Sequence, residues 1–202
     1  FDGTRLFPQR FSTTLKFELS EIENDLYDSV SEYVRTGMNQ AARMIEAGDR
    51  RGAVVGFALT GLQRRLASSP AAIHNSLQRR QRKLLEKVES WAQIVDEGGP
   101  ITISDLPSGV RLQDLEEFDY DSWTDEDLEE LEISIDGETA AATLQELENE
   151  AEAVGVLVEK AHAVLQSGED KKWNELRAFL NEDIDVLKIK YEKIFFTTRL
   201  IF

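Results

Sequence analysis

Apolar residues recur every three or four positions along most of the chain, which is the spacing of one face of an α-helix. The first such stretch lies between Ser20, which opens a Ser-x-x-Glu capping box, and Gly48, which suits the left-handed conformation that ends many helices. The second follows the capping residue Asp49 and is apolar on nearly every side, as expected for a helix buried among neighbours. Ser69 and Pro70 then fit the N-cap and first position of a third helix, so we expect a sharp turn there.

Two longer stretches carry the apolar seam of a coiled coil. Residues 70–97 place apolar side chains at spacings of 7, 4, 3 and 4, namely Leu77, Leu84, Val88, Trp91 and Val95. Residues 140–166 alternate spacings of 3 and 4 without a break, at Leu144, Leu147, Ala151, Val154, Val158, Ala161 and Leu165. The segment between them, 98–137, is acidic and is interrupted by Gly98, Gly99, Pro100 and Pro107. The pattern therefore predicts an antiparallel pair of long helices joined by a partly ordered acidic tip.

The two ends of the chain have a different pattern. Residues 11–19 alternate apolar and polar side chains and predict a short strand, and residues 190–202 are rich in β-branched and aromatic side chains and predict another. Gly168 closes the second long helix, and a short amphipathic helix follows it, marked by Trp173, Leu176, Phe179 and Leu180. The expected fold class is mainly all-α: a helical bundle with a long antiparallel coiled-coil-like hairpin and short terminal β-strands.

Composition narrows the class of protein. Hydrophobic residues make up 41% of the 202 residues, enough to bury a core, and the 31% of charged residues fits long exposed helices. The absence of cysteine excludes disulfides and thiolate metal sites. No apolar run is long enough for a membrane span and no signal sequence is present, so we expect a cytoplasmic protein without a membrane partner. Because the chain opens at Phe1 without an initiator Met, we expect a piece of a longer protein.

The net charge of -16 conceals a division along the chain. Residues 35–87 contain eleven basic and three acidic residues, whereas residues 96–152 contain twenty acidic residues and Arg111 as their one basic residue. Six basic side chains flank the turn at Ser69 and could converge on one side of it; this basic cluster consists of Arg64, Arg65, Arg79, Arg80, Arg82 and Lys83. Charge alone supports two interpretations equally. The cluster contacts nucleic-acid phosphates, or it is a solvated face neutralised by the acidic half.

Catalytic motifs are missing from the sequence. There is no phosphate-binding GxxxxGK[ST] loop, no GxGxxG, no HExxH, no GxSxG and no EF-hand spacing. His74 and His162 have no His or Cys at ligand spacing, which favours surface or packing roles. The carboxylates within residues 119–132 have no apolar surroundings to raise a pKa, so a solvated acidic run is favoured over a catalytic pair. We therefore expect no catalytic, metal or cofactor residues in this chain.

Four segments resemble bacterial helicases of the SWI/SNF class, in superfamily two. The run LQRRLASSPAAI at 62–73, followed by Ser-Leu and Arg-Arg, is similar almost letter for letter to a segment of that family. The opening FDGTRLFPQR and the later LSEIENDLYDSVSEYV resemble the family's passage from its first motor lobe into its helical region, and KWNEL at 172–176 resembles the approach to its second lobe. The resemblance covers residues 1–97 closely and 139–180 loosely.

The resemblance implies a DNA helicase or translocase that hydrolyses ATP with Mg²⁺ and whose motor lobes, with their phosphate-binding motifs, lie outside this chain. It divides the chain into a helical region following the first lobe (1–97), an acidic insertion without a counterpart (98–138), and a return helix leading to the second lobe (139–202). Two other functions stay open. The seams could bind a partner helix or a second copy as a non-enzymatic module, or the acidic insertion could act as a DNA mimic or autoinhibitory flap over the basic cluster.

Overall fold

The computed structural model describes residues 14–96 and 125–187, which divide into two units. Residues 21–169 contain five of the described helices: α1 (Glu21–Glu46), α2 (Arg51–Ser68), α3 (Pro70–Asp96), α5 (Asp125–Ile135) and α6 (Leu144–Ser167). The second unit contains residues 14–20, which form no regular element, and α7 (Lys171–Leu187). No described helix is long and apolar enough to cross a membrane. The part of the chain that the structure describes is therefore mainly α-helical, as the sequence predicts.

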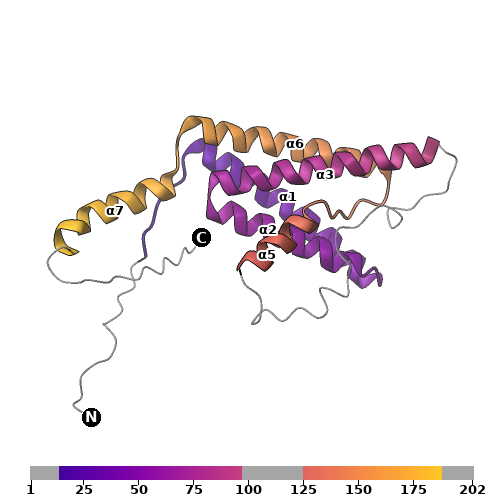
Figure 1. Ribbon diagram of the computed structural model, residues 1–202, viewed down its shortest axis with the longest axis horizontal. Coiled ribbons are helices and arrows are strands. Elements are labelled where there is room, and N and C mark those ends of the chain that lie inside the picture. The colour runs from indigo at the N-terminus through magenta and orange to yellow at the C-terminus, as the bar shows by residue number, and fades with distance from the viewer. Residues whose placement is uncertain (1–13, 97–124, 188–202) are drawn as a thin grey trace, which may run out of the picture. The chain divides into compact units, whose positions relative to one another are not determined.

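Four helices of the larger unit form a closed ring in which α1 packs on α2, α2 on α3, α3 on α6 and α6 on α1 (Figure 1). The long helices α3 and α6 are antiparallel, because His74 lies against His162 whereas Arg80 pairs with Glu150. The predicted antiparallel pair of long helices is thus present. Helices α1 and α6 are also antiparallel, since Lys160 near the end of α6 contacts Asp25 near the start of α1 at 2.8 Å. This arrangement is a four-helix bundle.

Local signals in the sequence set the helix boundaries. Gly48 has a φ of +83° and, with Asp49, donates backbone hydrogen bonds to the last turn of α1 in the pattern of a Schellman motif. The Ser69 hydroxyl accepts a hydrogen bond from the Ala72 amide at 3.1 Å, so Ser69 caps α3 and Pro70 occupies its first position. Gly168, with a φ of +67°, ends α6. These predicted boundaries are confirmed.

The core of the bundle is built from the seams of α3 and α6 and from the apolar faces of α1 and α2. Residues with almost no exposed surface include Val30, Leu59, Leu77, Leu84, Leu147 and Val154. The α6 seam departs from the sequence pattern at its C-terminal end, where Leu165 is 37% exposed and Val164 is buried in its place. Val164 lies beside the seam, on the same side of α6 as the buried Leu157 seven residues earlier, and α6 packs on α1 as well as on α3.

Helix α5 lies within the segment that the sequence identifies as an acidic insertion, and it packs on the outside of the bundle against α2 (Figure 1). Its Leu131 and Ile135 contact Val54, Phe57 and Ala58 in a small apolar cluster separate from the main core. The second part of the acidic segment is therefore a folded helix.

The structure shows no strand among its described residues. The strand expected at 11–19 is absent over 14–19, which form no regular element, and residues 11–13 lie outside the described part of the chain. The second expected strand, at 190–202, also lies outside it.

Candidate nucleic-acid interface

Four members of the basic cluster meet one face of α5. Arg64 and Arg65 stand at the end of α2, and Arg79 and Lys83 stand on α3 beyond the turn at Ser69. Each of the four contacts a carboxylate or carbonyl oxygen of α5 or of the residue that follows it. We call Arg64, Arg65, Arg79 and Lys83 the basic face. The predicted convergence of side chains across the turn is observed for these four.

Glu132 of α5 is held between the two arginines of α2. Its carboxylate pairs with Arg64 through one oxygen and with Arg65 through the other, the latter at 3.0 Å. The Glu132 side chain is only 8% exposed, and that of Arg65 is 19% exposed. Burial acts to lower the pKa of Arg65, but hydrogen bonds and charges from Glu132 and Glu129 outweigh burial and raise it. Arg64 keeps 57% of its side chain exposed.

The basic side chains of α3 hold the C-terminal end of α5. Arg79 pairs with Asp136 at 2.8 Å, and the Lys83 ammonium donates to the backbone carbonyls of Ile133 and Ser134, the second at 3.0 Å. Helix C-terminal carbonyls carry partial negative charge, so a cation stabilises them. Burial raises the pKa of Asp136 and lowers that of Lys83, and in each case the opposite charges nearby reduce the shift.

Arg80 points in the opposite direction, into the bundle, and only 1% of it is exposed. Its guanidinium donates to the Tyr33 hydroxyl at 2.6 Å and to one oxygen of Glu150 at 2.7 Å. It also donates to the backbone carbonyls of Asp136 at 2.8 Å and Glu138 at 2.9 Å, just after α5. Arg80 therefore ties together α1, α3, α6 and the connection between α5 and α6. The structure differs here from the expectation of an exposed cluster, because Arg80 is inside the protein.

The partners of Arg80 are also bonded to one another. Tyr33 donates to Glu150 at 2.7 Å, and Thr139 donates to the second oxygen of the same carboxylate. Burial alone would raise the pKa of Glu150, but the Arg80 charge and the hydrogen bonds from Thr139, Tyr33 and Arg80 outweigh it and lower the pKa. Burial raises the pKa of Tyr33 far above its usual value, although the Arg80 charge opposes this. The buried guanidinium and the half-buried carboxylate are thus both charged and both hydrogen-bonded.

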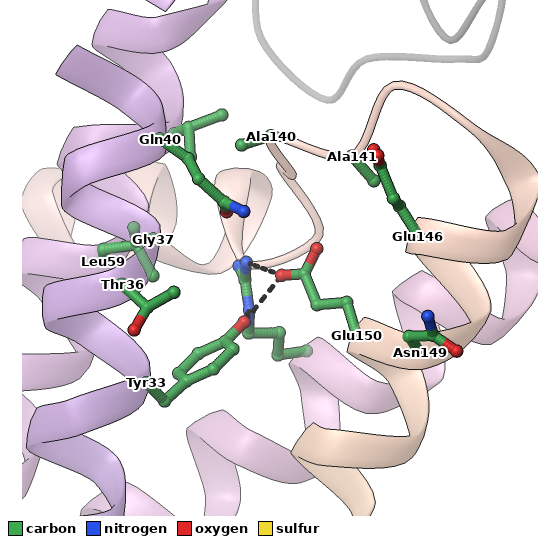
Figure 2. Close-up of a pocket in the computed structure, with 12 residues that line it drawn as sticks. Tyr33, Thr36, Gly37, Gln40, Leu59, Ala140, Ala141, Glu146, Asn149 and Glu150 are labelled. Atoms are coloured by element: carbon green, nitrogen blue, oxygen red, sulfur yellow. Dashed lines mark hydrogen bonds and ion pairs between the residues drawn. The ribbon is translucent and has the colours of Figure 1, made fainter. Parts of the chain in front are cut away.

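A pocket of about 270 Å³ lies beside this network, between α1 and the start of α6 (Figure 2). Figure 2 shows Tyr33 and Glu150 pointing toward one another at its edge, with Gln40 and Glu146 on its other sides. The charged side chains at its edge already engage each other, and no nucleophile stands next to a free general base among the lining residues. The pocket has the features of a structural polar network and offers no catalytic arrangement.

The other candidate residues from the sequence, Arg82, His74 and His162, lie outside the basic face and the Arg80 network. Arg82 faces solvent, with 66% of its side chain exposed and Glu86 as a distant partner at 3.7 Å. The rings of His74 and His162 stack across α3 and α6 with centroids 5.7 Å apart, a packing contact for the first and a surface position for the second. Within the described residues, no group of three or more His, Asp or Glu side chains could hold a metal ion.

Tyr33, Glu150, Glu132 and Asp136 are parts of the site that sequence reasoning does not identify. The sequence does contain one sign that Arg80 is buried. The α3 seam passes from Leu77 to Leu84 in a single step of seven, and Arg80 occupies the skipped position. A charged residue within a buried seam requires a buried partner.

Comparisons of the chain with protein-family models, with curated proteins and with solved structures found no match. The resemblance to SWI/SNF-type helicases therefore rests on the sequence segments at 1–97 and 139–180.

Proposed function

We propose that this chain is the helical insert between the two motor lobes of a SWI/SNF-type ATP-dependent DNA translocase, where it contacts the DNA backbone and couples the lobes. ATP and Mg²⁺ belong to the lobes, and no step of ATP hydrolysis is assigned to residues of this chain. The segment at 62–73 that resembles the family spans the end of α2 and the start of α3; it contains Arg64 and Arg65 of the basic face and precedes Arg79 and Lys83. The resemblance and the candidate interface thus fall on the same part of the fold.

The observation that carries the proposal is the geometry of the basic face. Side chains from two consecutive helices converge there and bind oxygen atoms of one acidic helix. Arginine binds carboxylates and phosphates with the same forked geometry, so a surface that holds Glu132 and Asp136 also fits phosphate oxygens. Phosphate contacts position a protein on DNA without reading its sequence. The chemistry of the face supports a role in backbone contact, although in the structure its four side chains are paired with the acidic segment.

The six residues of the basic cluster divide into separate roles under this proposal. The basic face supplies the phosphate contacts, with Arg64 the most accessible member. Arg82 adds positive charge on the solvent side of α3. Arg80, which is buried, keeps α3 in register with α1 and α6 and so holds Arg79 and Lys83 in place.

The proposal is tested by binding of a fluorescent DNA duplex to the whole chain over a series of salt concentrations. Replacing Arg64 and Arg65 by Gln should weaken binding and flatten the slope of log affinity against log salt by roughly 0.9 for each phosphate that is no longer neutralised. Arg35→Gln with Arg43→Gln is the matched control, since both residues are exposed on α1 and the change in net charge is the same. Circular dichroism should show equal helical content in all proteins.

Acidic side chains of α5 oppose DNA, so each measurement is repeated with Glu129→Gln, Glu132→Gln and Asp136→Asn present. Equal effects of the two arginine pairs, or no DNA binding in either background, would refute the proposal. Loss of helical content on replacing Arg64 and Arg65 would assign these arginines to the stability of the fold.

The alternative of a coiled-coil interaction module receives less support. Its basis is the pair of apolar seams, and in the structure these seams pack against each other within one chain. Leu77 and Leu84 of α3 and Leu147 and Val154 of α6 are fully buried in this way.

A further inference from the structure

We infer that α5 is a tethered DNA mimic, which occupies the basic face in the absence of DNA and exchanges with the phosphate backbone of a DNA duplex. This inference rests on the proposed function and adds to it a regulatory partner for the same surface. It is carried by the charges of α5, by the way α5 is attached, and by the independence of the bundle core.

Three carboxylates, two on α5 and one on the residue just after it, lie on one side of the helix. Glu129, Glu132 and Asp136 stand three and four residues apart, which places them on successive turns of the same side. Each pairs with an arginine: Glu129 and Glu132 with Arg65, and Asp136 with Arg79. A row of carboxylates bound to arginines has the same chemistry as a row of phosphates on the same arginines. DNA and α5 therefore compete for one set of donors.

Two apolar side chains attach the described part of α5. Leu131 and Ile135 are buried against α2, and the cluster they form is separate from the main core. The other contacts that α5 makes with the basic face are ion pairs and hydrogen bonds, which a polyanion can replace one for one. No described side chain of α5 belongs to the main core, so the four-helix bundle keeps this apolar packing when α5 leaves.

The attachment is also uneven along α5. The chain just after α5 is fixed, because Arg80 binds the carbonyls of Asp136 and Glu138 and Thr139 binds Glu150. Glu129 is the first residue of α5 whose side chain is described; it pairs with Arg65 at 3.3 Å, and 59% of its side chain is exposed. Helix α5 is thus anchored at its C-terminal end and held more loosely ahead of it, so it can leave the basic face and remain close to it.

The experiment measures binding of a fluorescent DNA duplex to the full 202-residue chain and to a variant with Leu131→Ala and Ile135→Ala. This variant loosens α5 without changing any charge. If α5 competes with DNA, the variant binds DNA more tightly, by on the order of tenfold or more, because the competing contact is weakened. The charge variant with Glu129→Gln, Glu132→Gln and Asp136→Asn should also bind more tightly, and it serves if the apolar variant loses its fold.

Hydrogen exchange gives an independent readout. Addition of DNA to the unaltered chain should increase amide exchange in α5 and leave α3 and α6 protected. Unchanged amide exchange in α5 on DNA binding, or equal affinity of the unaltered chain and both variants, overturns the competition between α5 and DNA. If Arg64→Gln with Arg65→Gln still weakens binding in that case, the proposed function stands alone. Absence of DNA binding in every protein overturns both proposals together.

Discussion

Arg80 offers the sharpest test of how the bundle is held together. Replacement by Ala removes the ion-pair partner of the half-buried Glu150 carboxylate and two donors to the carbonyls of Asp136 and Glu138. Breaking a fully buried ion pair from one side costs about 3–5 kcal/mol. Glu150 keeps 18% of its side chain exposed and keeps its hydrogen bonds from Tyr33 and Thr139, so we expect the lower end of this range. Small domains have a total stability of about 5–15 kcal/mol. We therefore expect Arg80→Ala to remove a large part of the free energy of unfolding.

Arg82→Ala is the matched control, since it lies two residues away on the same helix and makes the same change in charge. Its side chain is 66% exposed and its partner Glu86 is 3.7 Å away, an arrangement worth less than about 1 kcal/mol. Urea denaturation followed by circular dichroism gives the free energy of unfolding of both variants. If Arg80→Ala and Arg82→Ala agree within about 1 kcal/mol, the reasoning about the buried network is wrong. The double variant Arg80→Met with Glu150→Met should regain part of the loss, because neither charge is then left alone.

Three further predictions concern the backbone, the pH dependence and the chemistry of the chain. Gly52→Ala should destabilise the protein, because a Cβ there would lie 2.5 Å from the Ala41 carbonyl oxygen. Gly56→Ala is the matched change in the same helix, and its Cβ would meet only the Met38 sulfur, at 3.9 Å. It should stabilise the protein by about 0.5–1 kcal/mol, measured in thermal melts. The pKa of Glu150 in the folded protein lies below its reference value of 4.5. The stabilisation of the fold by ionised Glu150 is therefore fully present above that pH and is lost as pH falls through the folded pKa. The difference in the free energy of unfolding between the unaltered chain and Glu150→Gln should accordingly shrink on acidification below pH 4.5. The isolated chain should show no ATP turnover above buffer background, and turnover that survives repurification would contradict the absence of phosphate-handling motifs.

The helical part of the fold is predictable because its signals are local. Gly48, Ser69 and Gly168 set helix ends through backbone geometry and short-range hydrogen bonds that a few neighbouring residues determine. The seams of α3 and α6 identify the paired faces through periodicity alone. The prediction fails at Leu165, because α6 also packs on α1, and a contact between segments so far apart in the sequence does not appear in the seam pattern.

The polar site is not predictable in the same way, because its partners are far apart in the sequence. Arg80 is bound by a hydroxyl from α1 and a carboxylate from α6, 47 and 70 residues away. Helix α5 falls within the predicted acidic tip, since its charge pattern resembles a solvated run. Its folded position depends on Arg65 and Arg79, which lie more than 50 residues earlier. Charge counts show that the two halves are complementary, but pairing individual residues requires the fold.

The antiparallel contact between Lys160 and Asp25 has a consequence for how the bundle connects to other segments. Because the start of α1 and the end of α6 lie at the same end of the four-helix ring, the chain enters and leaves the bundle through neighbouring positions. A domain with adjacent entry and exit points can be spliced into a host sequence without stretching the segments on either side. Residues 21–169 are therefore suited to transplantation as a single cassette.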